Sequence, residues 1–402
     1  MFLKFKKYGN VKLLSLFYVF YNFRLYSVLA VIYFYQITHS YTLALSIFSV
    51  AQISQGLFEI PFGYYSDKYG RSNCLRVGVL ASLLSVVLYA IGQNYWFLVI
   101  GAIFEGINYA SFSGNNDALL YETLQESNKK NDYHHEYGKM NSWLELSGFL
   151  GVFVGSLFTS RSLSLLFTLS ILPRLLAAII SLAFVDPEVK KKKIENVVLH
   201  LKDSWLIYKS NFKIRLLSIA DIISYIGGVT WNFQSAFYNL FLPTWATSMV
   251  MSVNFFTSFV SFRLSGKLIQ RYKAIKVLFY QEIYSRVLIL LAYIFPSIAS
   301  PFLVATASVS YGPSVVAKST ILQNEFTNEQ RATMTSINSF VGNIIYSISA
   351  IFVGIAADKF GVAKSLLVVQ LFMVSILIIY SRLYLSNKRE KSNSYLVDKI
   401  TT

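Results

Sequence analysis

Residues 59–76, EIPFGYYSDKYGRSNCLR, form a short polar stretch between two long apolar runs. The first run ends near Gly63, and the second begins near Cys74. Asp67 and Arg71 lie four residues apart, a spacing at which two side chains share one face of a helix. The pattern predicts a tight, charged loop that joins the two arms of a hydrophobic hairpin.

The composition of the whole chain places this hairpin in a membrane. Of the 402 residues, 54% are hydrophobic and 14% are charged, whereas about 25% of the residues of a soluble domain are charged. A net charge of +16 would suggest nucleic acid in a soluble protein, but here the topology explains it, and we expect no nucleic-acid partner. One cysteine and four histidines without ligand spacing predict no metal and no cofactor.

Twelve apolar segments are long enough to cross a bilayer, which takes about 20 residues. They cover residues 13–36, 43–66, 74–92, 96–121, 138–159, 163–185, 214–237, 241–262, 275–295, 300–322, 333–356 and 363–385. These spans predict an all-α integral membrane protein. Its expected parts are an N-terminal six-helix bundle (1–185), a linker with an amphipathic surface segment (186–213), a C-terminal six-helix bundle (214–385) and a tail (386–402).

The basic residues predict the orientation of this bundle. Lys and Arg gather at the N-terminus, in residues 63–76, in the linker, in residues 263–276 and in the tail, and the other side keeps only Arg161, Lys359 and Lys364. Loops on the cytoplasmic side are enriched in basic residues. We therefore expect a multi-pass protein of the cell (cytoplasmic) membrane with both termini in the cytoplasm, in contact with anionic lipids.

The second half contains a weak counterpart of the opening stretch. Residues 265–278, SGKLIQRYKAIKVL, keep a glycine and the positive charges but lose the aspartate. Two six-helix halves with matching loops are typical of a parallel repeat, in which a cavity lies between the halves near the middle of the membrane.

The run GYYSDKYGR resembles the signature of the major facilitator superfamily between its second and third helices. The pattern G-x-x-x-D-(R/K)-x-G-R is matched by Gly63, Asp67, Lys68, Gly70 and Arg71. The stretches EIPFG, SGNNDALLYETL and NEQRATMTSINSF resemble the drug-efflux-like bacterial permeases of that superfamily. The resemblance covers nearly the whole chain and implies two pseudo-symmetric bundles, a monomer, and a cavity lined by helices 1, 4, 7 and 10.

Two departures from the drug antiporters bear on proton antiport. Ala102 stands where their fourth helix often carries an arginine, four residues before Gly106. The fifth helix, SGFLGVFVGSLF, keeps three glycines and has no proline. Neither departure removes transport itself.

Charged residues inside the predicted spans carry the expected chemistry, since a charge at the bilayer centre costs about 3 kcal/mol or more unless it is paired or wet. We predict a substrate and proton-coupling site, and its residues are Arg24, Asn22, Glu59, Glu105, Asn108, Tyr109, Asp117, Asp221, Asn232, Gln234 and Tyr238. Arg24, Glu105 and Asp117 form the first set. The alternative for Arg24 is a static pair with one acid, and for residues 231–238 an aromatic belt at the interface.

The opening stretch is expected to act as a conformational gate. Its residues are Gly63, Asp67, Gly70 and Arg71, with Glu122 or Asp117 as a partner of Arg71. Asp67 would sit against a positive helix N-terminus when the cytoplasmic side is closed, and so stabilise the outward-open state. The alternative is a solvated turn whose charges follow topology.

These features predict a secondary active transporter that moves a small organic molecule by alternating access. Nucleotide-binding, zinc-protease and Ser-His-Asp patterns do not occur in the sequence, so we expect neither an enzyme nor an ATP-driven pump. Proton-coupled efflux is the preferred reading. Proton-coupled uptake of a metabolite or siderophore-like ligand is the alternative, and a non-transporting membrane sensor is a remote one.

Overall fold

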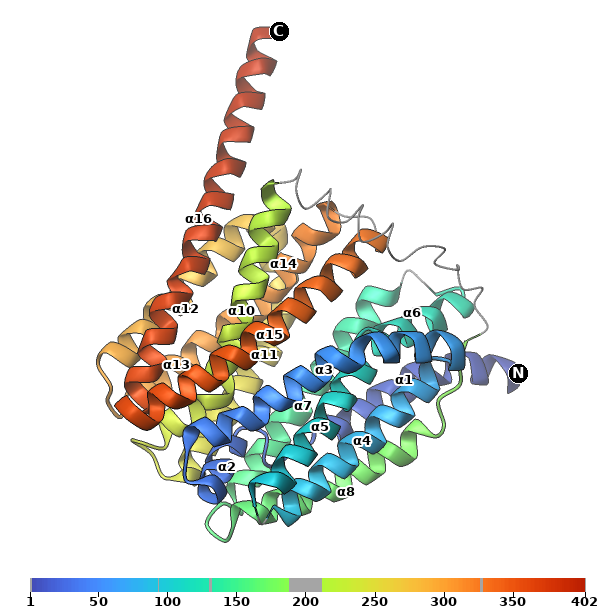
Figure 1. Ribbon diagram of the computed structural model, residues 1–402. Coiled ribbons are helices and arrows are strands. Elements are labelled where there is room, and N and C mark those ends of the chain that lie inside the picture. The colour runs from blue at the N-terminus through green and yellow to red at the C-terminus, as the bar shows by residue number, and fades with distance from the viewer. Residues whose placement is uncertain (1, 93, 130–131, 188–211, 326–327, 402) are drawn as a thin grey trace.

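The computed structural model describes residues 2–92, 94–129, 132–187, 212–325 and 328–401. These residues are helical almost throughout, and no strand occurs among them (Figure 1). The first half contains α1 (Phe2–Asn22), α2 (Ala30–Thr38), α3 (Tyr41–Tyr69), α4 (Arg71–Ile91), α5 (Tyr95–Phe112), α6 (Asn115–Glu126), α7 (Tyr133–Ser156) and α8 (Leu163–Ser181). The second half contains α10 (Phe212–Tyr238), α11 (Thr244–Tyr272), α12 (Ala274–Ile294), α13 (Ser300–Ala307), the 3₁₀ turn η2 (Ser308–Ser310), α14 (Tyr311–Glu325), α15 (Asn328–Phe360) and α16 (Val362–Thr401).

Within the described residues, seven helical segments are long and apolar enough to cross a membrane by length and composition alone. They lie in α3, α4, α5 with α6, α8, α12, α15 and α16. The remaining predicted spans correspond to α1 with α2, α7, α10, α11 and α13 with α14. Those helices are interrupted or carry more polar side chains. The architecture agrees with the predicted all-α membrane fold of two helical halves.

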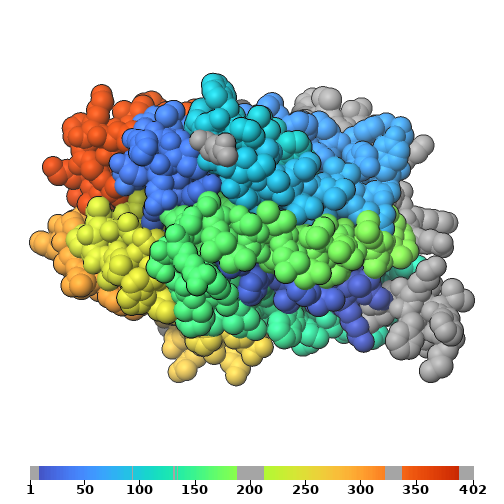
Figure 2. All heavy atoms as spheres, turned by 90° about the horizontal axis from the view of Figure 1, so that it is seen from below, coloured from blue at the N-terminus to red at the C-terminus, as the bar shows by residue number. Residues whose placement is uncertain are grey.

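The two halves meet along two seams. In one seam α3 packs along α15, and in the other α7 packs along α11. Ser49 and Ser347 tie the first seam, since each hydroxyl donates to the other residue's carbonyl oxygen, at 3.0 and 3.2 Å. We call the end of the bundle with the α3–α4 and α11–α12 joints the basic face, and the end with the α2–α3 and α15–α16 joints the opposite face. Figure 2 views the opposite face and shows the side chains of the two halves in contact across it.

The first predicted span is broken, which corrects the expected continuous helix at residues 13–36. Helix α1 ends at Asn22 and α2 begins at Ala30, so residues 23–29 are not helical. Non-helical backbone at membrane depth is tolerated where it is buried in protein or lines a cavity. Here Leu25 N donates to Ser170 Oγ of α8 at 3.1 Å.

Glycines of α7 make room for this break. A Cβ on Gly151 would lie 2.9 Å from the backbone nitrogen of Arg24, and one on Gly155 would lie 2.3 Å from the carbonyl oxygen of Leu25. The glycines that the sequence places in the fifth span therefore serve close backbone approach to the first.

Two other predicted spans are also interrupted. The fourth, expected at residues 96–121, is divided between α5 and α6 at Ser113 and Gly114, and Gly114 has a φ of 71°. The tenth, expected at residues 300–322, contains η2 just before Pro313, close to the kink that a proline predicts. The tail expected from residue 386 continues α16 as a helix. The predicted amphipathic linker segment lies outside the described residues.

The opening stretch is two helix ends rather than the predicted loop. Helix α3 continues to Tyr69 and α4 starts at Arg71, so Gly70 alone joins them. Gly70 has a φ of 99°, in a region that side chains with a Cβ rarely adopt. Asp186, which follows α8, accepts the backbone N–H of Ser72 at 2.9 Å and so caps α4.

We expect Gly70→Ala to destabilise the protein. The φ of 99° would strain alanine, and the new Cβ would lie 2.2 Å from Asp186 Oδ2, so the cap would have to move. Such strain costs on the order of 1–3 kcal/mol. The measurement is thermal unfolding in detergent, followed with a maleimide dye, because Cys74 is the single cysteine and is buried.

Gly63→Ala is the matched control for Gly70→Ala. Gly63 lies inside α3, and a Cβ there would meet nothing within 4 Å. Its melting temperature should be unchanged or slightly higher, because alanine favours a helix over glycine. Equal losses in the two variants would contradict a special role for Gly70.

Candidate functional site

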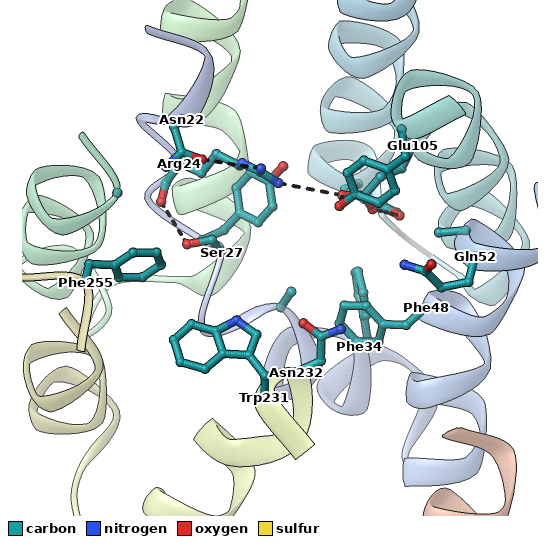
Figure 3. Close-up of a pocket in the computed structure, with 16 residues that line it drawn as sticks. Asn22, Arg24, Ser27, Phe34, Phe48, Gln52, Glu105, Trp231, Asn232 and Phe255 are labelled. Atoms are coloured by element: carbon teal, nitrogen blue, oxygen red, sulfur yellow. Dashed lines mark hydrogen bonds and ion pairs between the residues drawn. The ribbon is translucent and has the colours of Figure 1, made fainter. Parts of the chain in front are cut away.

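A cavity of about 240 Å³ lies between the two halves, near the break in the first span. Its volume is close to the lower end of the range for small-molecule pockets. The end of α1, residues 23–29, α2, α3, α4, α5 and α7 line it from the first half, and α10 and α11 from the second. Figure 3 draws its 16 lining residues: Asn22, Arg24, Tyr26, Ser27, Ala30, Phe34, Phe48, Ala51, Gln52, Tyr89, Glu105, Tyr109, Gly148, Trp231, Asn232 and Phe255.

Glu105 of α5 is the acidic group of the cavity. Its Oε2 accepts a hydrogen bond from the Tyr89 hydroxyl at 2.8 Å, and its Oε1 accepts one from the Tyr109 hydroxyl at 2.7 Å. Each oxygen of the carboxyl group is therefore held by one tyrosine hydroxyl. The two tyrosines fix the position of this charge.

Arg24 faces Glu105 from the broken part of the first span (Figure 3). Its Nη1 lies 3.9 Å from Glu105 Oε1, and its Nη2 donates to Asn22 Oδ1 at 3.5 Å. Both distances are longer than the 2.7–2.9 Å or so of a strong charge-assisted hydrogen bond. Arg24 is held near Glu105 without being saturated, so its donors remain available to a ligand.

Aromatic side chains form much of the remaining cavity wall. Trp231 of α10 and Phe255 of α11 meet edge to face, with ring centroids 5.8 Å apart. Phe34 and Phe48 lie together on the side of the first half, with centroids 5.4 Å apart. In Figure 3 the amide of Gln52, beside Phe48, points into the cavity. The cavity thus combines an ion pair with aromatic walls.

The structure brings together five residues of the predicted site. Asn22, Arg24, Glu105, Tyr109 and Asn232 line the cavity. Asn232 also donates to the Tyr346 hydroxyl of α15 at 2.7 Å. These residues come from the broken first span, α5 and α10, as expected for the first, fourth and seventh spans.

Three other predicted polar residues do not line the cavity. Asn108 is buried and donates to the Tyr21 hydroxyl at 2.7 Å. Gln234 and Tyr238 bond to each other within α10, with Gln234 Nε2 donating to the Tyr238 hydroxyl at 2.7 Å. Their neighbour Trp231 does reach the cavity. Helical spacing alone does not say which face of α10 points inward.

The remaining predicted carboxylates also lie outside the cavity lining. Asp117 sits in the first turn of α6. Glu59 accepts a hydrogen bond from Ser113 Oγ at 3.0 Å. Asp221 of α10 forms an ion pair with Lys318 of α14 and accepts a hydrogen bond from Asn338 at 3.2 Å. Asp221 therefore belongs to a polar cluster of the second half.

The predicted gate residues gather around Arg71. Its guanidinium lies 3.4 Å from Asp67 Oδ1 and 3.5 Å from Glu122 Oε1, and it donates to Asn115 Oδ1 at 3.0 Å. Of the two acids expected as partners, Glu122 is the one in contact. These bonds join the α3–α4 connection to α6 on the basic face of the first half.

Comparison with known proteins identifies the fold and the family. The family model of the Major Facilitator Superfamily matches residues 13–350, most of the chain. The chain belongs to the Major Facilitator Superfamily. Members of this superfamily are multi-pass membrane transporters of small molecules and are not enzymes. The resemblance carried by residues 63–71 is thereby confirmed.

The curated relatives match the superfamily protein over limited stretches. The quinolone resistance protein NorB of Staphylococcus aureus (strain Newman) is 26% identical over 146 residues, 36% of this chain and 30% of that protein. An uncharacterized transporter of Buchnera aphidicola, BU466, is 34% identical over 77 residues, 19% of each chain. The matches thus span less than a third of either relative's length.

Solved structures match the superfamily protein over nearly its whole length. The nucleoside transporter NupG superposes with a TM-score of 0.74 at 14% identity, covering 96% of this chain and 99% of that one. A D-xylose-proton symporter superposes with a TM-score of 0.69 at 13% identity, covering 93% and 96%. At these identities the likeness is one of fold.

Asp358 makes a contact between the two halves that was not predicted from the sequence. It lies near the end of α15, and its carboxylate accepts hydrogen bonds from the backbone N–H groups of Tyr41 and Thr42 at 2.7 and 3.0 Å. It also accepts the hydroxyls of Ser40 and Thr42, both at 2.7 Å. A residue of one half thus caps the N-terminus of α3 in the other half and holds the opposite face closed.

We expect Asp358→Asn to loosen this closure. A charge at an exposed helix N-terminus is worth about 0.3–1 kcal/mol, so the population open at the opposite face should rise roughly two- to five-fold. The measurement is the distance distribution between spin labels at Trp96 and Phe360, two exposed positions on that face. Lys359→Gln, a charge change at the exposed neighbour, is the control and should leave the distances unchanged. Unchanged distances in Asp358→Asn would contradict a closing role.

Tyr89 and Lys318 were also missed. Lys318 lies inside a predicted span, so its charge alone marked it as functional or paired. Tyr89 carried no such signal, since its role depends on the position of α4 against α5.

Proposed function

We propose that the protein is a secondary active transporter that exports a small organic molecule across the cytoplasmic membrane in exchange for protons. The observation that carries the proposal is the Arg24–Glu105 pair in a cavity that both halves build. A charge pair at membrane depth is costly unless it has a task or full compensation, and this pair is loosely held.

In this proposal, alternating access arises when the two halves rock about the two seams between them. The basic face is taken as cytoplasmic, because cytoplasmic loops are enriched in Lys and Arg. The bonds of Asp358 close the opposite face, so the cavity would exchange its contents with the cytoplasm in this state. Rocking of the halves about the α3–α15 and α7–α11 seams would then expose the cavity to the outside.

Glu105 is the proposed proton carrier. A proton on Glu105 would turn one of its acceptor oxygens into a donor, so one tyrosine hydroxyl would lose its acceptor. It would also remove the negative charge beside Arg24, whose guanidinium would then be free for a ligand. Proton and substrate thereby compete for one pair of groups, which is a workable means of coupling.

Export is preferred over uptake because several stretches resemble drug-efflux-like permeases and because NorB is named a quinolone resistance protein. The test uses proteoliposomes with a pH-sensitive dye inside and a labelled compound that binds the purified protein. Coupled export predicts that the compound moves against the direction of proton flow. Movement of both in the same direction would support the uptake alternative, and binding without any flux would support a sensor.

We expect Asp67→Asn to block transport while ligand affinity stays measurable, because the proposed gate acts on the conformational step and not on the cavity. Asp67 lies 3.4 Å from Arg71 and is not among the residues that line the cavity. Transport rate and binding affinity are measured on the same preparation. Normal transport by Asp67→Asn would refute the gate.

A further inference from the structure

A second arginine lies behind the cavity. The Cζ atom of Arg174, in α8, is 4.1 Å from the ring centroid of Tyr21, and that of Arg24 is 5.6 Å from the same centroid. The two guanidinium groups are therefore at most about 10 Å apart, which is one Debye length at 0.1 M salt. Since buried charges are screened less than this, Arg174 acts on the cavity through the protein interior.

The charge of Arg174 is not compensated by a carboxylate. Its side chain is buried, at 3% exposure, and its Nη1 has no hydrogen-bond partner among the described residues. In the same part of the chain, no acidic oxygen lies within 4.0 Å of its guanidinium. By contrast, Arg286, the buried arginine of the second half, contacts Glu282 at 2.6 Å. The partners that Arg174 does have are aromatic, namely the Tyr21 ring and a hydrogen bond with Tyr26. A buried charge without an opposite charge is costly, so Arg174 calls for a role.

The lining residues together with Arg174 therefore carry one positive charge in excess. Of its lining residues, Arg24 and Glu105 are the ones charged at neutral pH, and they balance each other. Arg174 adds a second cation, and a low local dielectric strengthens its effect. An anion in the cavity would restore neutrality, whereas a cation would add to the imbalance.

The shape of the cavity narrows the ligand further. Arg24 offers unsaturated donors in a planar fork, which suits a carboxylate. Trp231 and Phe255 offer two aromatic rings on the other side, set nearly at right angles to each other (83°), so a planar ring can lie against the face of one and the edge of the other. A volume of about 240 Å³ leaves room for a small molecule.

We propose that the cavity binds a small aromatic carboxylate, whose anionic group contacts Arg24 and whose ring lies against Trp231 and Phe255. Arg174 favours this anion through its charge without touching it, so it is a positioning residue. This inference rests on the proposed function, because it names the class of cargo that the transporter carries.

Three probes of matched shape and different charge test the class. Indole-3-acetate, indole-3-acetamide and tryptamine share the ring and are anionic, neutral and cationic near neutral pH. Binding is read as a rise in melting temperature, followed through the reaction of the buried Cys74 with a maleimide dye. We expect the acetate to raise the melting temperature and the other two probes to leave it unchanged.

Variants then separate charge from structure. Arg24→Gln should abolish the rise in melting temperature with indole-3-acetate. In Arg174→Gln the same rise should require a several-fold higher concentration of indole-3-acetate. Arg174→Lys keeps the charge and should restore most of the affinity, which a purely structural role would not predict. Arg161→Gln removes an exposed arginine of the loop before α8 and should bind as the unmodified protein does.

Each contrary outcome has its own meaning. Equal or stronger stabilisation by tryptamine or the acetamide overturns the anionic class, although the cavity remains a binding site and the proposed function stands. No stabilisation by any of the three probes overturns the aromatic-carboxylate assignment. Because comparison of the probes uses the unmodified protein, it is decisive even if a variant fails to fold. Failure of the proposed function would appear separately, as binding of the acetate without flux in proteoliposomes.

Discussion

Glu105→Gln is expected to uncouple transport from the proton gradient. Glutamine keeps the size of the side chain but cannot bind and release a proton, and its amide nitrogen cannot accept the hydroxyl of Tyr89 or Tyr109. Proton-driven transport in proteoliposomes should fall by about tenfold or more, which corresponds to at least about 1.4 kcal/mol in the barrier. Exchange of labelled for unlabelled substrate, which needs no net proton movement, should persist.

The comparison of the two assays makes this result interpretable. Asp132→Asn removes an exposed carboxylate just before α7 and serves as the control, with both activities retained. If Glu105→Gln loses both exchange and driven transport with normal folding, the residue binds substrate and does not carry the proton. If it retains full driven transport, Glu105 has no part in coupling.

Gly155→Val is expected to cause a large loss of stability. A Cβ at this position would lie 2.3 Å from the carbonyl oxygen of Leu25 and 3.0 Å from its carbonyl carbon. These are backbone atoms of the broken first span and cannot turn aside as a side chain would. Overpacking of this kind costs about 1–3 kcal/mol or more, and displacement of residues 23–29 would also move Arg24. We expect a lower melting temperature and weaker ligand binding.

Gly138→Val is the control for this substitution, because Gly138 lies in the same helix and a Cβ there would meet nothing within 4 Å. Both substitutions change the helix propensity by the same amount, because each replaces a glycine by a valine within α7. A similar loss in both variants would show that helix α7, rather than the contact with Leu25, is the sensitive feature.

The helical architecture could be predicted from the sequence because it depends on local properties. Length, hydropathy and the placement of basic residues are set by the bilayer and can be read without knowing any contact. The break at residues 23–29 could not, because that stretch contains neither glycine nor proline. It depends on Ser170 and on Gly151 and Gly155, which lie in other helices.

The candidate site could be predicted in part for the same reason. Arg24 and Glu105 stood out because a charge within a span is costly wherever it points. Uncharged polar residues gave no such direction: Asn232 lines the cavity, whereas Gln234 turns to Tyr238. Deciding between them requires the rotation of α10 within the bundle, which tertiary packing sets.

The break in the first span also divides its two pieces between different neighbours. Helix α1 packs against α6, α7 and α8, whereas α2 packs against α3 and also against α10 of the other half. A shift of α10 that carried α2 along would be taken up at residues 23–29, with α1 left in place. The short non-helical stretch would then act as a hinge, and the relative motion of the halves would displace Arg24.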